Sequence, residues 1–315
     1  MEEKKVKELE IDFKDIDDML NLKSENVVYK LKINGLEKKD VEWKDNIFWS
    51  NLAYTLEHIY IKKGFMFDLS ETILPRDLKD ISGIFGNCES LVKGPVFPEG
   101  VKNMAETFRG CENLIEAPVI PNSVINMNET FMGCKSLIKA PVLPEGVLYM
   151  RGAFSRCKKL KEILNIPQWV ENMSGTFAGC TSLIEAPVLP QGVENMSWAF
   201  EECKSLVEAP VIPESVVDMW RTFYGCEKLN TAEKFQDTFK KISNTKIPVL
   251  DISKQIVLWM NDDEKKKLDN MFKKMDVLSE KDLEQVLFGW KEDFKKELKK
   301  DMKQEKKIEK DVRGR

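Results

Sequence analysis

The sequence predicts an α/β solenoid: an array of stacked coils with a parallel sheet, preceded by a small α+β unit and followed by an α-helical region. Three observations lead to this prediction. All seven cysteines lie 23 residues apart, and phenylalanine and leucine recur with the same period over the same stretch. The residues before the array show strand and helix patterns that do not repeat, and the residues after it show helical patterns alone.

The 23-residue period defines the array. Methionine, proline and valine keep it as well as cysteine, phenylalanine and leucine. The cysteines are Cys88, Cys111, Cys134, Cys157, Cys180, Cys203 and Cys226. Self-similarity at a fixed period between 20 and 29 residues is typical of leucine-rich repeats. Each repeat is one coil that cannot bury its own apolar face, so neighbouring coils bury it together, and equivalent residues form columns about 4.8 Å apart.

Within one repeat, the stretch "LIEAPVIP" predicts the strand and "NMNETFMGC" predicts a helical or turn return with Phe131 and Cys134 facing inward. The cysteines are expected to be reduced, because a free cysteine packs as a small apolar residue. Neighbouring cysteines would lie within disulfide range, but their number is odd and all occupy one equivalent position. No C-x-x-C pair exists, and the one histidine, His58, lies outside the repeats, so zinc is not expected.

The pattern C-x-x-L-x-x-A-P-x-x-P-x-x-V-x-N-M-x-x-T-F-x-G-C is similar to the BspA-like leucine-rich repeat family of bacteria and some protists, over about residues 85–230. The resemblance implies a right-handed solenoid and a protein-binding role, often at cell surfaces. The fourth unit departs from the pattern, with Ile163 in place of alanine and Leu164 in place of proline. This departure predicts a local bend or a specialised contact.

The flanks suggest three domains, over residues 1–71, 72–230 and 231–315. In the first, "NVVYKLKING" and "GFMFDLS" read as strands around an amphipathic helix. The apolar stripe of that helix consists of Ile47, Phe48, Leu52, Leu56 and Ile59.

The last domain is predicted to be helical and charged. A capping-box pattern begins at Ser279 and opens a long helix with an apolar stripe through Trp290. Residues 231–315 hold 22 Lys+Arg against 18 Asp+Glu, in a chain whose net charge is -4. Bulk charge therefore gives no reason to expect a strongly basic nucleic-acid binder.

No catalytic motif is present: the sequence lacks a P-loop, a dinucleotide-binding glycine pattern, H-E-x-x-H and a nucleophile elbow. We therefore expect a non-enzymatic protein without cofactor or metal. The first residues lack the basic and apolar regions of a signal peptide, and no apolar run reaches ~18 residues. A cytoplasmic location is expected, or a surface location if a signal has been removed.

Outward positions of the array carry the candidate binding residues. One group is an acidic row on successive coils, which would suit a basic partner or be an ordinary solvated face. It consists of Glu162, Glu185 and Glu208. The other group holds residue types that dominate interface hot spots, and it would bind a partner or dock the C-terminal helices. It consists of Trp198, Trp220, Arg221 and Tyr224, with Trp169 as a further candidate.

The function predicted is a protein-interaction scaffold in the cytoplasm, either an adaptor or an inhibitor of a host enzyme such as a phage-type anti-defence protein. A second hypothesis is a bacterial surface adhesin whose export signal has been removed. A third is a nucleic-acid-associated factor that uses the basic C-terminal helices. The oligomeric state is not predicted.

Overall fold

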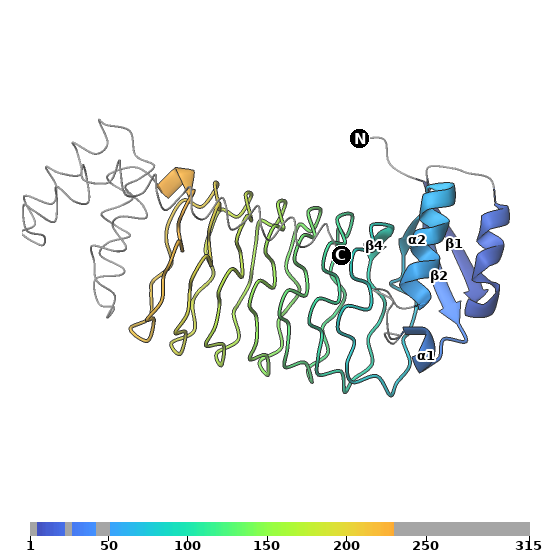
Figure 1. The fold of residues 1–315 in the computed structure, drawn as a ribbon, viewed down its shortest axis with the longest axis horizontal. Helices are drawn as coiled ribbons and strands as arrows, with labels where there is room; N and C mark the ends of the chain where they lie inside the picture. The colour runs from blue at the N-terminus through green and yellow to red at the C-terminus, as the bar shows by residue number, and fades with distance from the viewer. Residues whose placement is uncertain (1–4, 23–26, 42–50, 230–315) are drawn as a thin grey trace, which may run out of the picture.

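The computed structural model describes residues 5–22, 27–41 and 51–229. Figure 1 shows a compact unit of helices and strands at one end and a row of stacked coils that extends from it. The predicted C-terminal helices lie outside the described residues. Parallel pairing and few helices agree with the predicted leucine-rich-repeat type of fold, while the handedness of the array stays a prediction.

One parallel sheet connects the N-terminal unit to the array. Its strand order is β1-β2-β3-β4, and every neighbouring pair is parallel. The strands are β1 (Lys5–Asp12), β2 (Val27–Asn34), β3 (Met66–Asp68) and β4 (Leu91–Lys93). Because β4 already belongs to the first cysteine repeat, the N-terminal unit extends the sheet of the array. The all-parallel pairing makes this unit α/β, where the sequence predicted α+β.

Helices cover the N-terminal part of this sheet (Figure 1). They are the 3-10 helix η1 (Phe13–Asn21), α1 (Lys38–Val41) and α2 (Asn51–Lys63). Helix α2 buries Leu52, Leu56 and Ile59 completely, as predicted, whereas the other two residues of the predicted stripe, Ile47 and Phe48, lie outside the described residues. Both predicted strands are confirmed as β2 and β3. Strand β1 was not predicted, because its charged sequence KVKELEID is that of an exposed edge strand.

Buried hydrogen bonds hold the unit against the first coil. The carboxylate of Glu57, on α2, accepts a bond of 2.7 Å from the backbone N–H of Ser90. The hydroxyl of Thr72 accepts a bond from the N–H of Ile33 (3.2 Å) and donates one to the carbonyl of Leu31 (2.8 Å). These bonds satisfy polar groups that would be costly to bury alone.

Each coil consists of successive tight turns, and most of the residues that recur in the 23-residue pattern are the first and last residues of these turns. The turns span P-x-x-V, M-x-x-T, F-x-x-C and C-x-x-L, and the N–H of the last residue bonds to the carbonyl of the first. One coil has the bonds Val124–Pro121 (3.1 Å), Thr130–Met127 (3.2 Å), Cys134–Phe131 (3.0 Å) and Leu137–Cys134 (3.1 Å). In this coil the first and last residues of all four turns are buried, so the chain places an inward side chain at nearly every third position. The predicted return is therefore made of turns.

Two ladders of parallel bridges join the coils. The longer ladder runs through the N-M stretch and links Asp80, Asn103, Asn126, Tyr149, Asn172, Asn195 and Asp218. The shorter one joins the pairs Lys93–Glu116, Lys139–Glu162 and Glu185–Glu208. The predicted strand "LIEAPVIP" is thus reduced to a single bridge after β4, because its prolines have no N–H to donate to a ladder.

Phenylalanine forms the central column. Consecutive rings from Phe85 to Phe223 are stacked with centroids 5.4–5.9 Å apart, and every ring is buried. The seven cysteines are free and buried, which confirms the reduced ladder. From Cys111 onward, each thiol donates to the carbonyl of the phenylalanine 26 residues earlier, at 3.0–3.1 Å. The sequence indicated a purely apolar corner around the cysteine. The structure shows that this corner also contains a backbone carbonyl that accepts a hydrogen bond from the thiol.

Candidate protein-interaction site

The M-x-x-T turn presents the candidate site, and its third residue has a positive φ in every described coil. The residues at this position are Gly83, Glu106, Glu129, Gly152, Gly175, Trp198 and Arg221, with φ between 54° and 64°. Turns with a positive φ at the third residue favour glycine or asparagine, because a Cβ there approaches the backbone. The last two coils place a tryptophan and an arginine in this position.

Trp198 combines this unfavourable backbone with an exposed ring. Its φ is 56° and 42% of the residue is exposed, although tryptophan is usually well buried. A bulky residue at positive φ is a conformational outlier, and such outliers cluster at functional sites. The local structure therefore gives no reason for a tryptophan at this position.

Replacing Trp198 by glycine is expected to leave the free energy of unfolding unchanged or to raise it by up to about 1 kcal/mol. The left-handed conformation costs a non-glycine residue roughly 1–2 kcal/mol, and the added freedom of the unfolded chain offsets part of that gain. Gly152 and Gly175 already occupy the equivalent position. Urea unfolding measures the effect, and a loss above ~2 kcal/mol would show that the ring stabilises the fold.

Trp220 and Arg221 are the two central residues of the next turn. The N–H of Trp198 donates to the carbonyl of Trp220 at 2.7 Å, so the backbones of the two turns lie side by side. Trp220 is 48% exposed. The N–H of Trp220 donates to the carboxylate of Asp218 at 2.9 Å, which fixes the start of the turn. The sequence already grouped Trp220 with Trp198 and Arg221, and the backbone bond between the two turns brings Trp198 next to Trp220.

Arg221 contacts side chains of its own array. Its guanidinium makes an ion pair of 2.6 Å with Glu201, and both side chains are about one-fifth exposed. The guanidinium also lies 3.9 Å from the centre of the Tyr224 ring, within the range of a cation–π interaction. These contacts hold the Arg221 guanidinium between Glu201 and Tyr224. We call Trp198, Trp220, Arg221 and Tyr224 the tryptophan patch.

The acidic row lies on a different stretch of the coil, along the shorter bridge ladder. Lys139 makes an ion pair of 3.3 Å with Glu162, which compensates the charge of that glutamate. Glu185 and Glu208 are paired by a backbone bridge, so two carboxylates occupy adjacent coils. The sequence places Lys139 on the coil before Glu162 in the same column, and the structure shows that the two side chains form an ion pair.

Trp169 lies in the P-x-x-V turn of the atypical fourth repeat, apart from the M-x-x-T turns. It is 62% exposed. The equivalent residues in the other repeats are Gly100, Ser123, Gly146, Gly192 and Ser215. Leu164, in the same repeat, is 71% exposed where the pattern has proline. The fourth repeat thus presents two large apolar side chains that the repeat pattern does not require.

The buried thiols are poor nucleophiles. Burial raises the pKa of all seven thiols, and for the six from Cys111 onward the pKa stays raised although a hydrogen bond with the backbone of the cysteine one repeat earlier lowers it. Because the thiolate is the reactive form, these groups are unsuited to covalent catalysis. In the described ranges, no three His, Cys, Asp or Glu side chains gather where they could hold a metal ion.

Comparison with protein families gives a match to the BspA type leucine rich repeat region, in six copies over residues 62–184 and 128–247. The chain belongs to this family. Leucine-rich repeat proteins are generally non-enzymatic binding scaffolds that mediate contact with other proteins. A comparison with curated proteins found no match. Among the residues that the structure describes, no helix has both the length and the apolar character needed to cross a bilayer.

Three solved leucine-rich repeat proteins are similar to this BspA-type chain. One is a leucine-rich repeat protein from T. pallidum with 28% sequence identity. The match covers 50% of this chain and 76% of the T. pallidum chain, with a TM-score of 0.42. Another, from Bacteroides ovatus, is 26% identical over 49% of this chain and 40% of its own, with a TM-score of 0.42. A cell surface protein from Faecalibacterium prausnitzii is 16% identical over 66% of this chain and 75% of its own, with a TM-score of 0.35.

Proposed function

We propose that this protein is a non-enzymatic scaffold that binds a protein partner through the tryptophan patch. In this proposal, residues 72–230 form a right-handed solenoid, residues 1–71 cap its first coil and residues 231–315 form a separate helical region. The observation that carries the proposal is Trp198, whose exposed ring is kept on a backbone conformation that favours glycine.

The patch has the composition of an interface centre. Tryptophan, tyrosine and arginine supply most of the binding energy in protein interfaces, because they bury a large area with few rotatable bonds. The ion pair to Glu201 and the contact with Tyr224 hold Arg221 in place before binding. Preorganisation of this kind reduces the entropy cost of association.

The partner that fits best carries a basic surface. Glu185 and Glu208, on adjacent coils, add negative charge to the same end of the array, and Trp169 adds apolar area in the fourth repeat. A cytoplasmic location, with a role as an adaptor or as an inhibitor of a host enzyme, belongs to this proposal.

The proposal is tested by capturing partners from an extract of the source organism on the immobilised full chain. We expect a protein that binds the wild type and is retained at least tenfold less by the double variant Trp198→Gly, Trp220→Ala. Loss of two hot-spot side chains commonly costs several kcal/mol of binding energy, which exceeds a factor of ten.

Leu148→Glu is the matched control. Leu148 is 39% exposed, close to the exposure of Trp198, and the equivalent positions in later repeats already hold Glu171 and Glu194. Capture should be unchanged by this control. A partner held equally by the wild type and the double variant would refute the assignment of the patch, provided that both proteins melt at the same temperature.

A further inference from the structure

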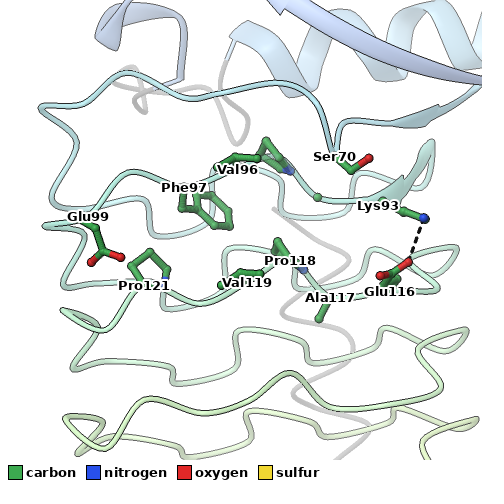
Figure 2. Close-up of a pocket in the computed structure, with 12 residues that line it drawn as sticks. Ser70, Lys93, Val96, Phe97, Glu99, Glu116, Ala117, Pro118, Val119 and Pro121 are labelled. Carbon is green, nitrogen blue, oxygen red and sulfur yellow. Dashed lines mark ion pairs between the residues drawn. The ribbon is translucent and has the colours of Figure 1, made fainter. Parts of the chain in front are cut away.

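A pocket of about 450 Å³ lies where the N-terminal unit meets the first two coils, far along the array from the tryptophan patch. Figure 2 shows its lining, to which two successive coils contribute the stretches G-P-V (residues 94–96) and A-P-V (residues 117–119). The wall is mainly apolar and includes Pro95, Val96, Pro118, Val119 and Pro121. Ser70, Lys93, Glu99 and Glu116 add polar groups to it.

Two departures from the repeat pattern shape this pocket. Gly94 stands where the pattern has alanine, and a Cβ there would lie 3.0 Å from both the Phe108 ring and the Pro118 ring. Phe97 stands where the other repeats have isoleucine or leucine, and its ring meets Phe108 edge-on with centroids 5.9 Å apart. The wall is therefore specific to the first two coils.

The pocket is open to solvent along one side. Val96 is 45% exposed and Val119 is 88% exposed, so the apolar lining continues onto the surface. The same position is exposed in later coils, where it holds Val142, Val188 and Val211. An occupant that enters the pocket therefore has apolar surface beside it, as suits a side chain of a longer polypeptide. Apolar patches of this kind mark interaction sites.

The polar groups at the pocket have a negative balance. Lys93 makes ion pairs with Glu116 (2.9 Å) and with Asp68 (3.7 Å), so one lysine faces two carboxylates. The hydrogen bond to Glu116, with the charges of both acids, raises the pKa of Lys93 and keeps it protonated at neutral pH. Glu99 is exposed and makes no ion pair with any residue in the part of the chain that the structure describes. A cation placed beside the pocket would be favoured by this surplus.

We propose that this pocket binds a bulky apolar side chain of a protein partner, aromatic by preference, next to a lysine or arginine that pairs with Glu99. The proline rings of the wall offer flat apolar faces to an aromatic ring. In domains that bind proline-rich segments, the domain supplies the aromatic rings and the ligand supplies the prolines. Here the pocket would supply the prolines and the partner the aromatic ring. Anchor side chains that fill pockets supply most of the binding energy of protein interfaces, and tryptophan, tyrosine and arginine are the commonest of them. This site is separate from the tryptophan patch and does not depend on it.

The test selects binders from a random peptide library on the full chain and measures the affinity of the best peptides for variants. We expect peptides with an aromatic residue beside Lys or Arg whose affinity falls at least tenfold with Val119→Glu. The matched control is Val188→Glu, at the same position three coils later and 85% exposed, which should leave the affinity unchanged.

A second pair of variants tests the charge. Glu99→Lys should weaken the same peptides at least threefold, whereas Glu145→Lys, at the equivalent exposed position two coils later, should have no effect. Selected peptides that bind Val119→Glu and the wild type equally would overturn the proposal, as would peptides without the aromatic and basic pair or a library that yields no binder. Trp198→Gly should not affect the affinity of these peptides. The proposal for the pocket and the proposal for the tryptophan patch are therefore tested independently.

Discussion

Raising the pH from 8 to 10 is expected to reduce the free energy of unfolding by an amount on the order of 10 kcal/mol. The reason is the ladder of buried thiols. Burial raises the pKa of each thiol, so the native chain keeps all seven protonated. In the unfolded chain, an exposed thiol ionises with a pKa of about 8.5.

The sign of the effect follows from proton linkage. Above the pKa of the unfolded thiols, the native state holds more protons than the unfolded state, so stability falls as the pH rises. The contribution of each thiol is fully present below that pKa and decreases by ~1.4 kcal/mol for every pH unit above it. Because a domain is stable by only about 5–15 kcal/mol, the chain should be close to unfolding at pH 10.

Urea unfolding in reducing buffer at several pH values measures the slope. The matched variant is Cys157→Ala, which removes one titrating thiol from a fully buried position. Its stability should fall by about 1.4 kcal/mol less per pH unit than that of the wild type. Parallel pH curves for the two proteins would show that other groups, such as lysines, cause the alkaline loss.

Replacing Phe131 by alanine is expected to destabilise the chain by about 3–5 kcal/mol. The Phe131 ring is completely buried and is stacked between the rings of Phe108 and Phe154, with centroids 5.5 Å from each. The substitution removes apolar area from the core and leaves a cavity that the turns on either side cannot close, because they are tied to neighbouring coils. Thermal and urea unfolding measure the loss.

Phe131→Leu is the control for this prediction. Leucine keeps most of the apolar volume, so its cost should be clearly smaller than that of alanine. Equal losses for the two variants would indicate that the stacked ring itself, and not the filled volume, stabilises the column. A loss below ~1 kcal/mol for alanine would contradict the central position of Phe131 in the core.

The sequence predicted the array well, because a strict period reports contacts directly. A residue that recurs every 23 positions must meet its own equivalents, and the Phe131 and Cys134 columns lie where the period places them. The α/β unit was predicted in part. Its helix α2 and strand β2 have clear apolar patterns, whereas β1 is an exposed edge strand whose charged residues resemble those of a loop.

The candidate sites could be predicted only in composition. Trp198 and Trp220 were found because they depart from the residues of other repeats, but the positive φ at Trp198 depends on the turn that the backbone forms. The pairing of Glu162 with Lys139 depends on the rotamers of two long side chains, which the period does not fix. The pocket follows from two small departures, Gly94 and Phe97, whose combined effect appears only when two coils pack together.

The uniform spacing of the coils also has an evolutionary meaning. Each phenylalanine ring meets the rings one repeat before and one repeat after it, so duplication or loss of a whole repeat would restore the same contacts. The pocket and the tryptophan patch lie near opposite ends of the described coils. Unequal crossing-over could therefore lengthen or shorten the span between these two sites in steps of one coil, and leave the chemistry of each intact.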